Sequence, residues 1–171
     1  MKKIIHNLLI ICFICYIILL VYFLFFSERY GRDQTYSSYQ YNLQLFREIK
    51  RYLAYRGQIG KELFIINVVG NVAAFMPMGF FVPVLYREQR GENTYRGHFV
   101  RSGIFVTLFG FLISFSVETI QLVTKVGCFD VDDLLMNTTG VLLGFLLYYI
   151  CKQILAILPW NHKKKKKKRE V

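Results

Sequence analysis

The sequence predicts an all-α membrane protein whose four transmembrane helices form a small bundle. Of its 171 residues, 54% are hydrophobic and 17% aromatic, which is more apolar than a soluble domain usually is. A helix needs about 20 apolar residues to cross a bilayer core. Four runs meet this length, at approximately 4–26, 62–86, 99–123 and 134–158. The formal net charge of +11 lies mostly outside these runs, so we expect it to meet membrane lipids rather than nucleic acid.

The first apolar run follows Lys2 and Lys3, as the apolar core of a signal peptide would. The run is too long for a signal peptide, and no Ala-x-Ala-like cleavage site follows it. We therefore assign residues 1–26 to an uncleaved first transmembrane helix.

The segment 27–61 is the first loop, and it contains QLFREIKRYLAYR at 44–56. Apolar residues recur there at helical spacing, with basic residues between them. This pattern predicts a short amphipathic helix that lies on the membrane surface, although an ordinary solvated helix remains an alternative.

Basic residues near the span ends predict the orientation in the membrane. One side of a four-span arrangement carries Lys2, Lys3, Arg87, Arg90, Arg96 and the basic tail 159–171. We expect this side to be cytoplasmic, with both termini inside. The loop 27–61 also holds seven basic residues, which oppose this orientation but are outweighed by the tail.

The third run contains an acidic residue, Glu118, whose presence in hydrocarbon needs a reason because such groups cost about 2.5–3.5 kcal/mol. Gln121 follows three residues later on the same helix face. Going back at helical spacing, the same face continues through small and polar residues: Ser114, Gly110, Thr107 and Gly103. Such a stripe is expected to face protein rather than lipid.

The second run carries Asn67 and Asn71 on one helix face, followed by Pro77 and Gly79. Proline lacks the N–H of a helical bond, so a carbonyl near Ala73 should be freed, and Gly79 gives room for a bend. A simple packing kink would explain Pro77 and Gly79 equally well.

The fourth run begins with acidic and amide residues on one helix face: Asp130, Asp133 and Asn137. Gly140 and Gly144 continue that face and would allow a neighbouring helix to approach closely. Asp130 could cap the helix, with Asp133 in its first turn, but capping does not explain Asn137 one turn deeper.

The predicted orientation brings these polar groups to the outer boundary of the membrane, in a candidate ligand-binding cluster that comprises Asn67, Asn71, Glu118, Gln121, Asp130, Asp133 and Asn137. The cluster could bind a cation, a sugar or a peptide, or it could be a purely structural network. Glu118 with Asp130 or Asp133 could also form a carboxylate acid/base pair. The three histidines fall near the cytoplasmic side, so a histidine relay is not expected. No cofactor is expected, and the residues identify neither a metal nor an oligomeric state.

Three motifs in the core 62–158 resemble the VanZ-like family: NVVGNVAAFMPMGF (67–80), SVETIQ (116–121) and FDVDDLLMNTTGVLLG (129–144). They occur in the family's order and spacing, and together the resemblance covers roughly residues 62–150. Many relatives have a basic residue shortly before the first aspartate. Here Gly127 and Cys128 stand there, and the nearest basic residue is Lys125.

The resemblance implies a protein of the bacterial cytoplasmic membrane, and the family's founding member is linked to low-level resistance to the glycopeptide teicoplanin. Three hypotheses follow. The protein could bind a lipid-linked cell-wall precursor or a lipoglycopeptide at the outer cluster without catalysis. It could be a membrane enzyme that acts on an envelope lipid. It could also be an accessory subunit whose cluster only packs helices.

Overall fold

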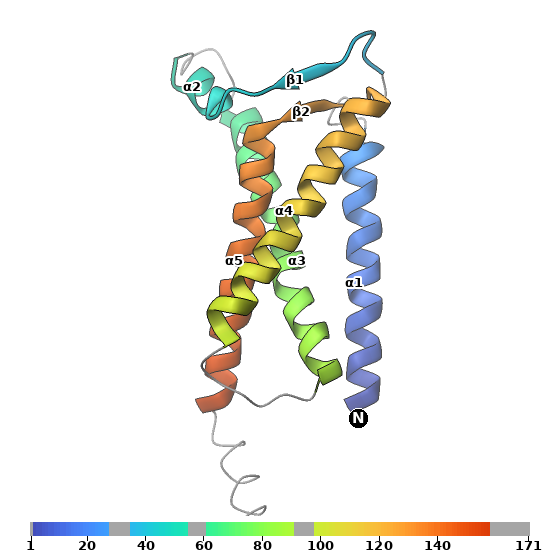
Figure 1. The fold of residues 1–171 in the computed structure, drawn as a ribbon, viewed down its shortest axis with the longest axis vertical. Coiled ribbons are helices and arrows are strands. Elements are labelled where there is room, and N and C mark those ends of the chain that lie inside the picture. The colour runs from blue at the N-terminus through green and yellow to red at the C-terminus, as the bar shows by residue number, and fades with distance from the viewer. Residues whose placement is uncertain (1, 28–34, 55–60, 91–97, 158–171) are drawn as a thin grey trace, which may run out of the picture.

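The computed structural model describes residues 2–27, 35–54, 61–90 and 98–157 (Figure 1). Its elements are, in chain order, α1 (Lys2–Phe25), β1 (Gln40–Asn42), α2 (Arg47–Ala54), α3 (Lys61–Arg90), α4 (His98–Thr124), β2 (Cys128–Asp130) and α5 (Val131–Ile157). Among the described helices, α1, α3, α4 and α5 are long and apolar enough to cross a membrane. The prediction of a four-helix membrane protein is confirmed.

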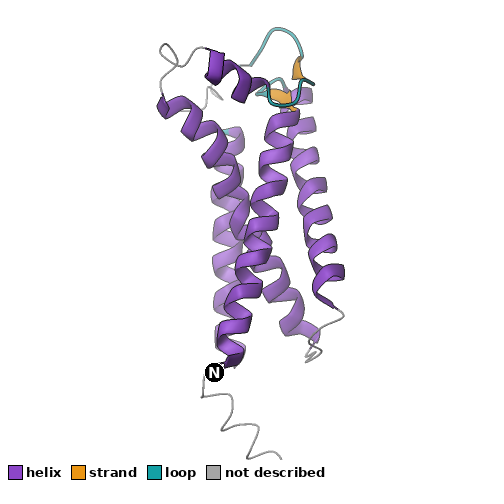
Figure 2. Cartoon of the chain, turned by 90° about the vertical axis from the view of Figure 1, so that its left-hand side faces the viewer, coloured by secondary structure: helices purple, strands orange, loops and turns teal. Residues whose placement is uncertain are grey.

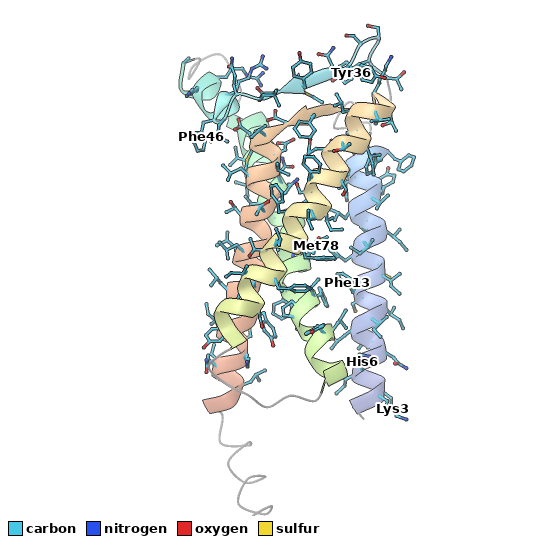
Figure 3. The ribbon with its side chains drawn as sticks, in the orientation of Figure 1. Lys3, His6, Phe13, Tyr36, Phe46 and Met78 are labelled. Atoms are coloured by element: carbon cyan, nitrogen blue, oxygen red, sulfur yellow. The ribbon has the colours of Figure 1, made fainter. Side chains whose placement is uncertain are left out.

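The helices run alternately up and down, so that α1 begins and α5 ends at the same end of the bundle (Figures 1 and 2). The opposite end carries β1, α2 and β2, and we call residues 35–54 and 125–130 the cap. Figure 3 places Tyr36 and Phe46 at this capped end, whereas Lys3 and His6 lie at the other end. The fold therefore separates His6 from the predicted polar cluster.

Helices α3 and α5 touch through their backbones at three glycines. A Cβ atom on Gly140 would run into the carbonyl oxygen of Val72, and one on Gly144 into that of Met76. A Cβ on Gly79 would meet the carbonyl oxygen of Val141 from the other side. Close approach of this kind is the main source of attraction between helices in lipid, where burial against apolar tails gains little.

Pro77 lies inside α3, as does Pro83, without ending the helix. Next to Pro77, the carbonyl of Ala74 accepts a hydrogen bond of 2.7 Å from the hydroxyl of Tyr16 on α1. The sequence predicted that a carbonyl near Ala73 would serve as an acceptor, and the carbonyl of Ala74, the next residue, does so. Helix α1 contributes Leu20 to the buried core and leaves most of its other apolar side chains exposed.

Two strands in the cap were not predicted. Within the described residues, β1 and β2 form a two-stranded parallel sheet, in which Gln40 is paired with Cys128 and Asn42 with Asp130. Strands of three residues are too short to appear among the long apolar runs from which the elements were predicted. The helix expected within 44–56 is present as the eight-residue α2.

Helix α5 begins three residues earlier than the apolar run that predicted it. Asp130 immediately precedes the helix, and its Oδ1 accepts a hydrogen bond of 2.8 Å from the N–H of Asp132. This is the bond an N-cap residue makes to the second residue of a helix. The acidic first turn is therefore part of α5, which places its carboxylates at fixed positions against α3 and α4.

Candidate functional site

Asp130 connects three segments at the capped end. Its two carboxylate oxygens accept hydrogen bonds of 3.0 and 3.1 Å from Nδ2 of Asn42 on β1. Its backbone N–H donates to Oε2 of Glu118 on α4, at 3.1 Å. Because Asp130 also caps α5, a single residue ties β1, α4 and α5 together.

Glu118 is buried, with 2% of its surface exposed. A carboxylate in such a position is tolerated when protein groups hydrogen-bond to it, and the Asp130 N–H is one of these groups. The small and polar stripe of α4 faces the protein, since Gly110 and Ser114 are buried as well. The other faces of α4 expose large apolar side chains such as Leu108 and Leu112, as expected of a helix in lipid.

Asp133 and Asn71 join α5 to α3. Nδ2 of Asn71 donates to Oδ1 of Asp133 at 2.6 Å. Asn67 stands one helical turn before Asn71 in α3, but its side chain lies outside the described residues. The same limit applies to the basic tail 159–171.

Asn137 lies one turn deeper in α5 than Asp133. Its Nδ2 donates to Oγ of Ser114 on α4 at 2.9 Å. The residue is 2% exposed, and its Oδ1 has no hydrogen-bond partner among the described residues. A buried acceptor without a donor is costly, so this oxygen is a position where a bound group could add a hydrogen bond.

Gln121 binds a different part of the molecule. Its Nε2 donates to the carbonyl of Leu24 at 2.9 Å. Leu24 lies in the last turn of α1, where carbonyls have no partner within the helix. The side chain of Gln121 therefore holds the end of α1 against α4, beside the network that surrounds Asp130.

Two buried polar residues of the network were missed by the sequence analysis, Asn42 and Asp132. Asn42 is 4% exposed, and Asp132 is 3% exposed and accepts a hydrogen bond from the N–H of Phe46. Phe46 has a φ of 62°, so the chain turns sharply there before α2 begins. A signal for Asn42 was present in the alternation of apolar and polar residues from Tyr39 to Leu43.

Lys125 contacts the beginning of the cap. Its Nζ donates to the carbonyl of Ser37 at 3.4 Å and lies 5.0 Å from the ring centre of Tyr39. Its backbone, at φ 58°, ends α4 in the left-handed conformation common after helices. The basic residue nearest to the aspartates thus fastens the segment that leads into β1.

The pKa of the Cys128 thiol depends on the charged residues of the site. Burial raises the pKa of its thiol, and the negative charges of Asp130, Glu118 and Asp133 raise it further, in that order. The positive charge of Arg47 acts in the opposite direction on the same pKa. The surroundings of Cys128 are therefore predominantly anionic.

The chemistry available at the site is that of hydrogen-bond acceptors. Carboxylate and amide oxygens of this kind suit a ligand that presents hydroxyl or amine donors. In the part of the chain that the structure describes, no three His, Cys, Asp or Glu residues are grouped so that they could hold a metal ion. The four carboxylates, from Glu118, Asp130, Asp132 and Asp133, each accept a hydrogen bond from another residue.

Comparison with known proteins relates the chain to a protein family. The sequence model of the family described as VanZ/LLP1 matches residues 13–152, which include the second half of α1, the cap, α3, α4 and most of α5. No curated protein and no solved structure matches the chain significantly.

Proposed function

The chain belongs to the VanZ/LLP1 family, and we propose that it is a multi-pass protein of the bacterial cytoplasmic membrane that contributes to resistance against glycopeptides or lipoglycopeptides of the teicoplanin type. In this proposal it acts without catalysis, through the polar network around Asp130 at the outer face. The founding member of the VanZ-like family is linked to teicoplanin resistance, and this link supports the proposal by analogy.

The observation that carries the proposal is the convergence of polar groups on Asp130 and its neighbours. Helix α3 contributes Asn71, helix α4 contributes Glu118, and β1 contributes Asn42. These segments are far apart in the sequence but meet at one end of the bundle. A carboxylate buried as deeply as that of Glu118 is expensive to keep, and a binding role would explain why it is retained.

The charges of the two terminal segments support the proposed orientation. The basic residues at Lys2, Lys3 and in the tail 159–171 favour cytoplasmic termini. The start of α1 and the end of α5 lie at the same end of the bundle, opposite the cap. The cap then faces outward, where glycopeptides act on cell-wall precursors.

The proposed ligand is a lipid-linked cell-wall precursor or a lipoglycopeptide. Both classes carry many hydroxyl and amide donors, which match the acceptors of the network. The buried Oδ1 of Asn137 is one such acceptor. Both classes also carry a lipid chain, so they would reach the site from within the membrane.

The test compares Glu118→Gln and Asp133→Asn, made separately, in a teicoplanin-sensitive bacterium that expresses the protein. Both variants keep size and hydrogen-bonding capacity but remove a charge. We expect normal protein abundance and a teicoplanin inhibitory concentration that falls to that of cells with empty vector. The control is Ser116→Ala on an exposed face of α4, which should leave both readouts unchanged.

A second candidate is a structural or accessory role, and one specific observation favours it. Every carboxylate of the network already accepts a hydrogen bond that joins two segments of the chain or caps α5. Under this role, Glu118→Gln and Asp133→Asn would lower abundance and resistance together. The enzyme hypothesis for Glu118 with Asp130 or Asp133 would instead require turnover of a labelled precursor by the purified protein.

A further inference from the structure

Strand β1 buries the polar side chain of Asn42, whereas the apolar side chains of the strand and of the residues beside it are exposed. Tyr39, Tyr41 and Leu43 are 61%, 65% and 65% exposed. Asn42 between them is 4% exposed and points into the polar network. Successive strand residues point to opposite faces, so the apolar residues from 39 to 43 share one outward face. A strand at a water-covered surface has the opposite pattern.

This apolar face continues onto α4. In the parallel register Tyr41 is paired with Phe129 of β2, and paired residues point to the same side of a sheet. The ring of Phe129 meets that of Phe115 edge-on, with centroids 5.8 Å apart. Phe115 in turn stacks on Phe111, at 6.4 Å. These four residues form what we call the aromatic strip, which runs from β1 over β2 to α4.

The lower part of the aromatic strip belongs to the lipid-facing surface of a membrane span. Phe111 and Phe115 are exposed on α4 beside other exposed apolar residues, including Leu108 and Leu112. Such a surface on a transmembrane helix contacts acyl chains. Because the strip is continuous, its upper part at Tyr41 should have the same occupant. An aromatic patch of this kind would be unfavourable against water.

The charges beside the strip fit a lipid headgroup. Arg47 and Lys50 are exposed on α2, which follows β1 directly. Lys125 lies over the ring of Tyr39. Tyrosine together with arginine and lysine is the composition found where a protein crosses the headgroup layer, since the rings meet lipid while the cations meet phosphate.

We propose that the outer face of β1 is a lipid-docking surface, which rests on anionic phospholipid at the boundary between headgroups and acyl chains. The cap is then embedded in the edge of the membrane instead of projecting into water. The hydrogen bond between Asn42 and Asp130 lies directly behind this surface. This inference rests on the membrane-spanning fold and does not depend on the role in resistance.

The test introduces single tryptophans on the apolar face of β1 and, as a control, beside it. Trp160 is the chain's single tryptophan, so Trp160→Phe gives a silent background for the full-length protein in phosphatidylglycerol-containing nanodiscs. Tyr41→Trp and Leu43→Trp report on the apolar face. Ser38→Trp is the matched control, because residue 38 is exposed but lies in the bend before β1, outside the apolar face. Fluorescence is quenched from the lipid with a phospholipid spin-labelled near the headgroup, and from water with acrylamide.

We expect the lipid quencher to reduce the fluorescence of Tyr41→Trp and Leu43→Trp at least twofold more than that of Ser38→Trp. Acrylamide should show the reverse order. Equal, strong quenching of all three variants by acrylamide would place β1 in water and overturn the proposal. Tyr41→Trp could instead be protected from both quenchers, with the protection lost when the protein is diluted with empty lipid. That result would show that a second copy of the chain covers this face, and it would also overturn the proposal.

Discussion

The carboxylate of Glu118 accepts a hydrogen bond from the backbone N–H of Asp130, while the side chain of Asp130 accepts two from Asn42. The two acidic residues are thus joined by the backbone N–H of Asp130, which donates to the side chain of Glu118, and their carboxylates do not bond to each other directly. A glutamine at position 118 would retain an oxygen for the Asp130 N–H. Glu118→Gln therefore removes the negative charge but keeps the hydrogen bond that helps to hold the fold together.

The first prediction concerns Asn42, which joins the cap to the bundle. Asn42→Ala should lower the free energy of unfolding by about 1.5–3 kcal/mol, because it removes two bonds to a charged acceptor. Asn42→Asp should lower the free energy of unfolding more than Asn42→Ala does, because it places a second carboxylate against that of Asp130. Chemical unfolding of the purified protein in detergent measures both.

Gln44→Ala serves as the control for Asn42, because the side chain of Gln44 is exposed and its backbone N–H still donates to Asn42. If Asn42→Asp unfolded no more easily than Asn42→Ala, Asp130 would not carry the negative charge that we assign to it.

The second prediction concerns the contact between α3 and α5. Gly144→Ala would drive a Cβ into the backbone at Met76, which cannot move aside. The free energy of unfolding should fall by at least the roughly 1–3 kcal/mol that is typical of overpacking. Gly103→Ala is the matched control. Its Cβ would meet the ring of Phe145 at 2.9 Å, and a side chain can shift. Abundance in membranes and detergent unfolding should both rank Gly144→Ala well below Gly103→Ala.

The sequence was informative where the membrane imposed a strict rule. A charged or amide group inside an apolar helix needs a partner, and helical spacing says which face holds it. This reasoning singled out Glu118, Asn71, Asp133 and Asn137, and the structure brings these residues into bonds between spans or, for Glu118, with the cap.

The cap was beyond the same reasoning. Asn42 and Asp130 are 88 positions apart in the chain, and nothing in the local pattern of either says that they meet. Asp132 does not lie on the helix face that carries Asp130, Asp133 and Asn137. Helical spacing therefore gave no reason to assign it to the site. Its actual partner is a backbone N–H at Phe46, where the chain takes a left-handed turn that side-chain chemistry alone does not reveal.

The third prediction concerns the reactivity of Cys128. Its pKa is raised by burial and by neighbouring carboxylates, so its thiolate forms only at a higher pH than that of an ordinary thiol. With Cys12, Cys15 and Cys151 replaced by serine, alkylation by iodoacetamide should be slow at neutral pH and reach its half-maximal rate above the ordinary thiol pKa.

Two charge variants give the sign of this effect. Arg47→Gln removes a positive charge that lowers the Cys128 pKa, and should shift the alkylation profile to still higher pH. Asp133→Asn removes a negative charge and should shift it to lower pH. Profiles that move together in both variants would show that access, not charge, controls the reaction.

The fourth prediction concerns sidedness. In the cysteine-free protein, Ser38→Cys in the cap should react with a membrane-impermeant maleimide added to intact cells. Thr94→Cys, in the connection between α3 and α4, should react only after the cells are opened. The opposite result would turn the cap toward the cytoplasm and remove the basis for an outer-face site, while the packing of the helices would stand unchanged.

The fifth prediction concerns Asn137, whose Oδ1 has no partner within the described part of the chain. Asn137→Leu removes a buried polar group and roughly keeps its volume. The Ser114 hydroxyl loses the N–H that it accepts from Asn137, but it can still donate to a carbonyl of its own helix. Stability should therefore change by less than about 1 kcal/mol. If the oxygen awaits a donor from a ligand, as the proposed function requires, teicoplanin resistance should nevertheless fall to the vector level. A variant that unfolds readily, by contrast, would assign Asn137 to the packing of α4 against α5. The result thus decides between binding and packing at Asn137, a site residue whose acceptor stays open within the described part of the chain.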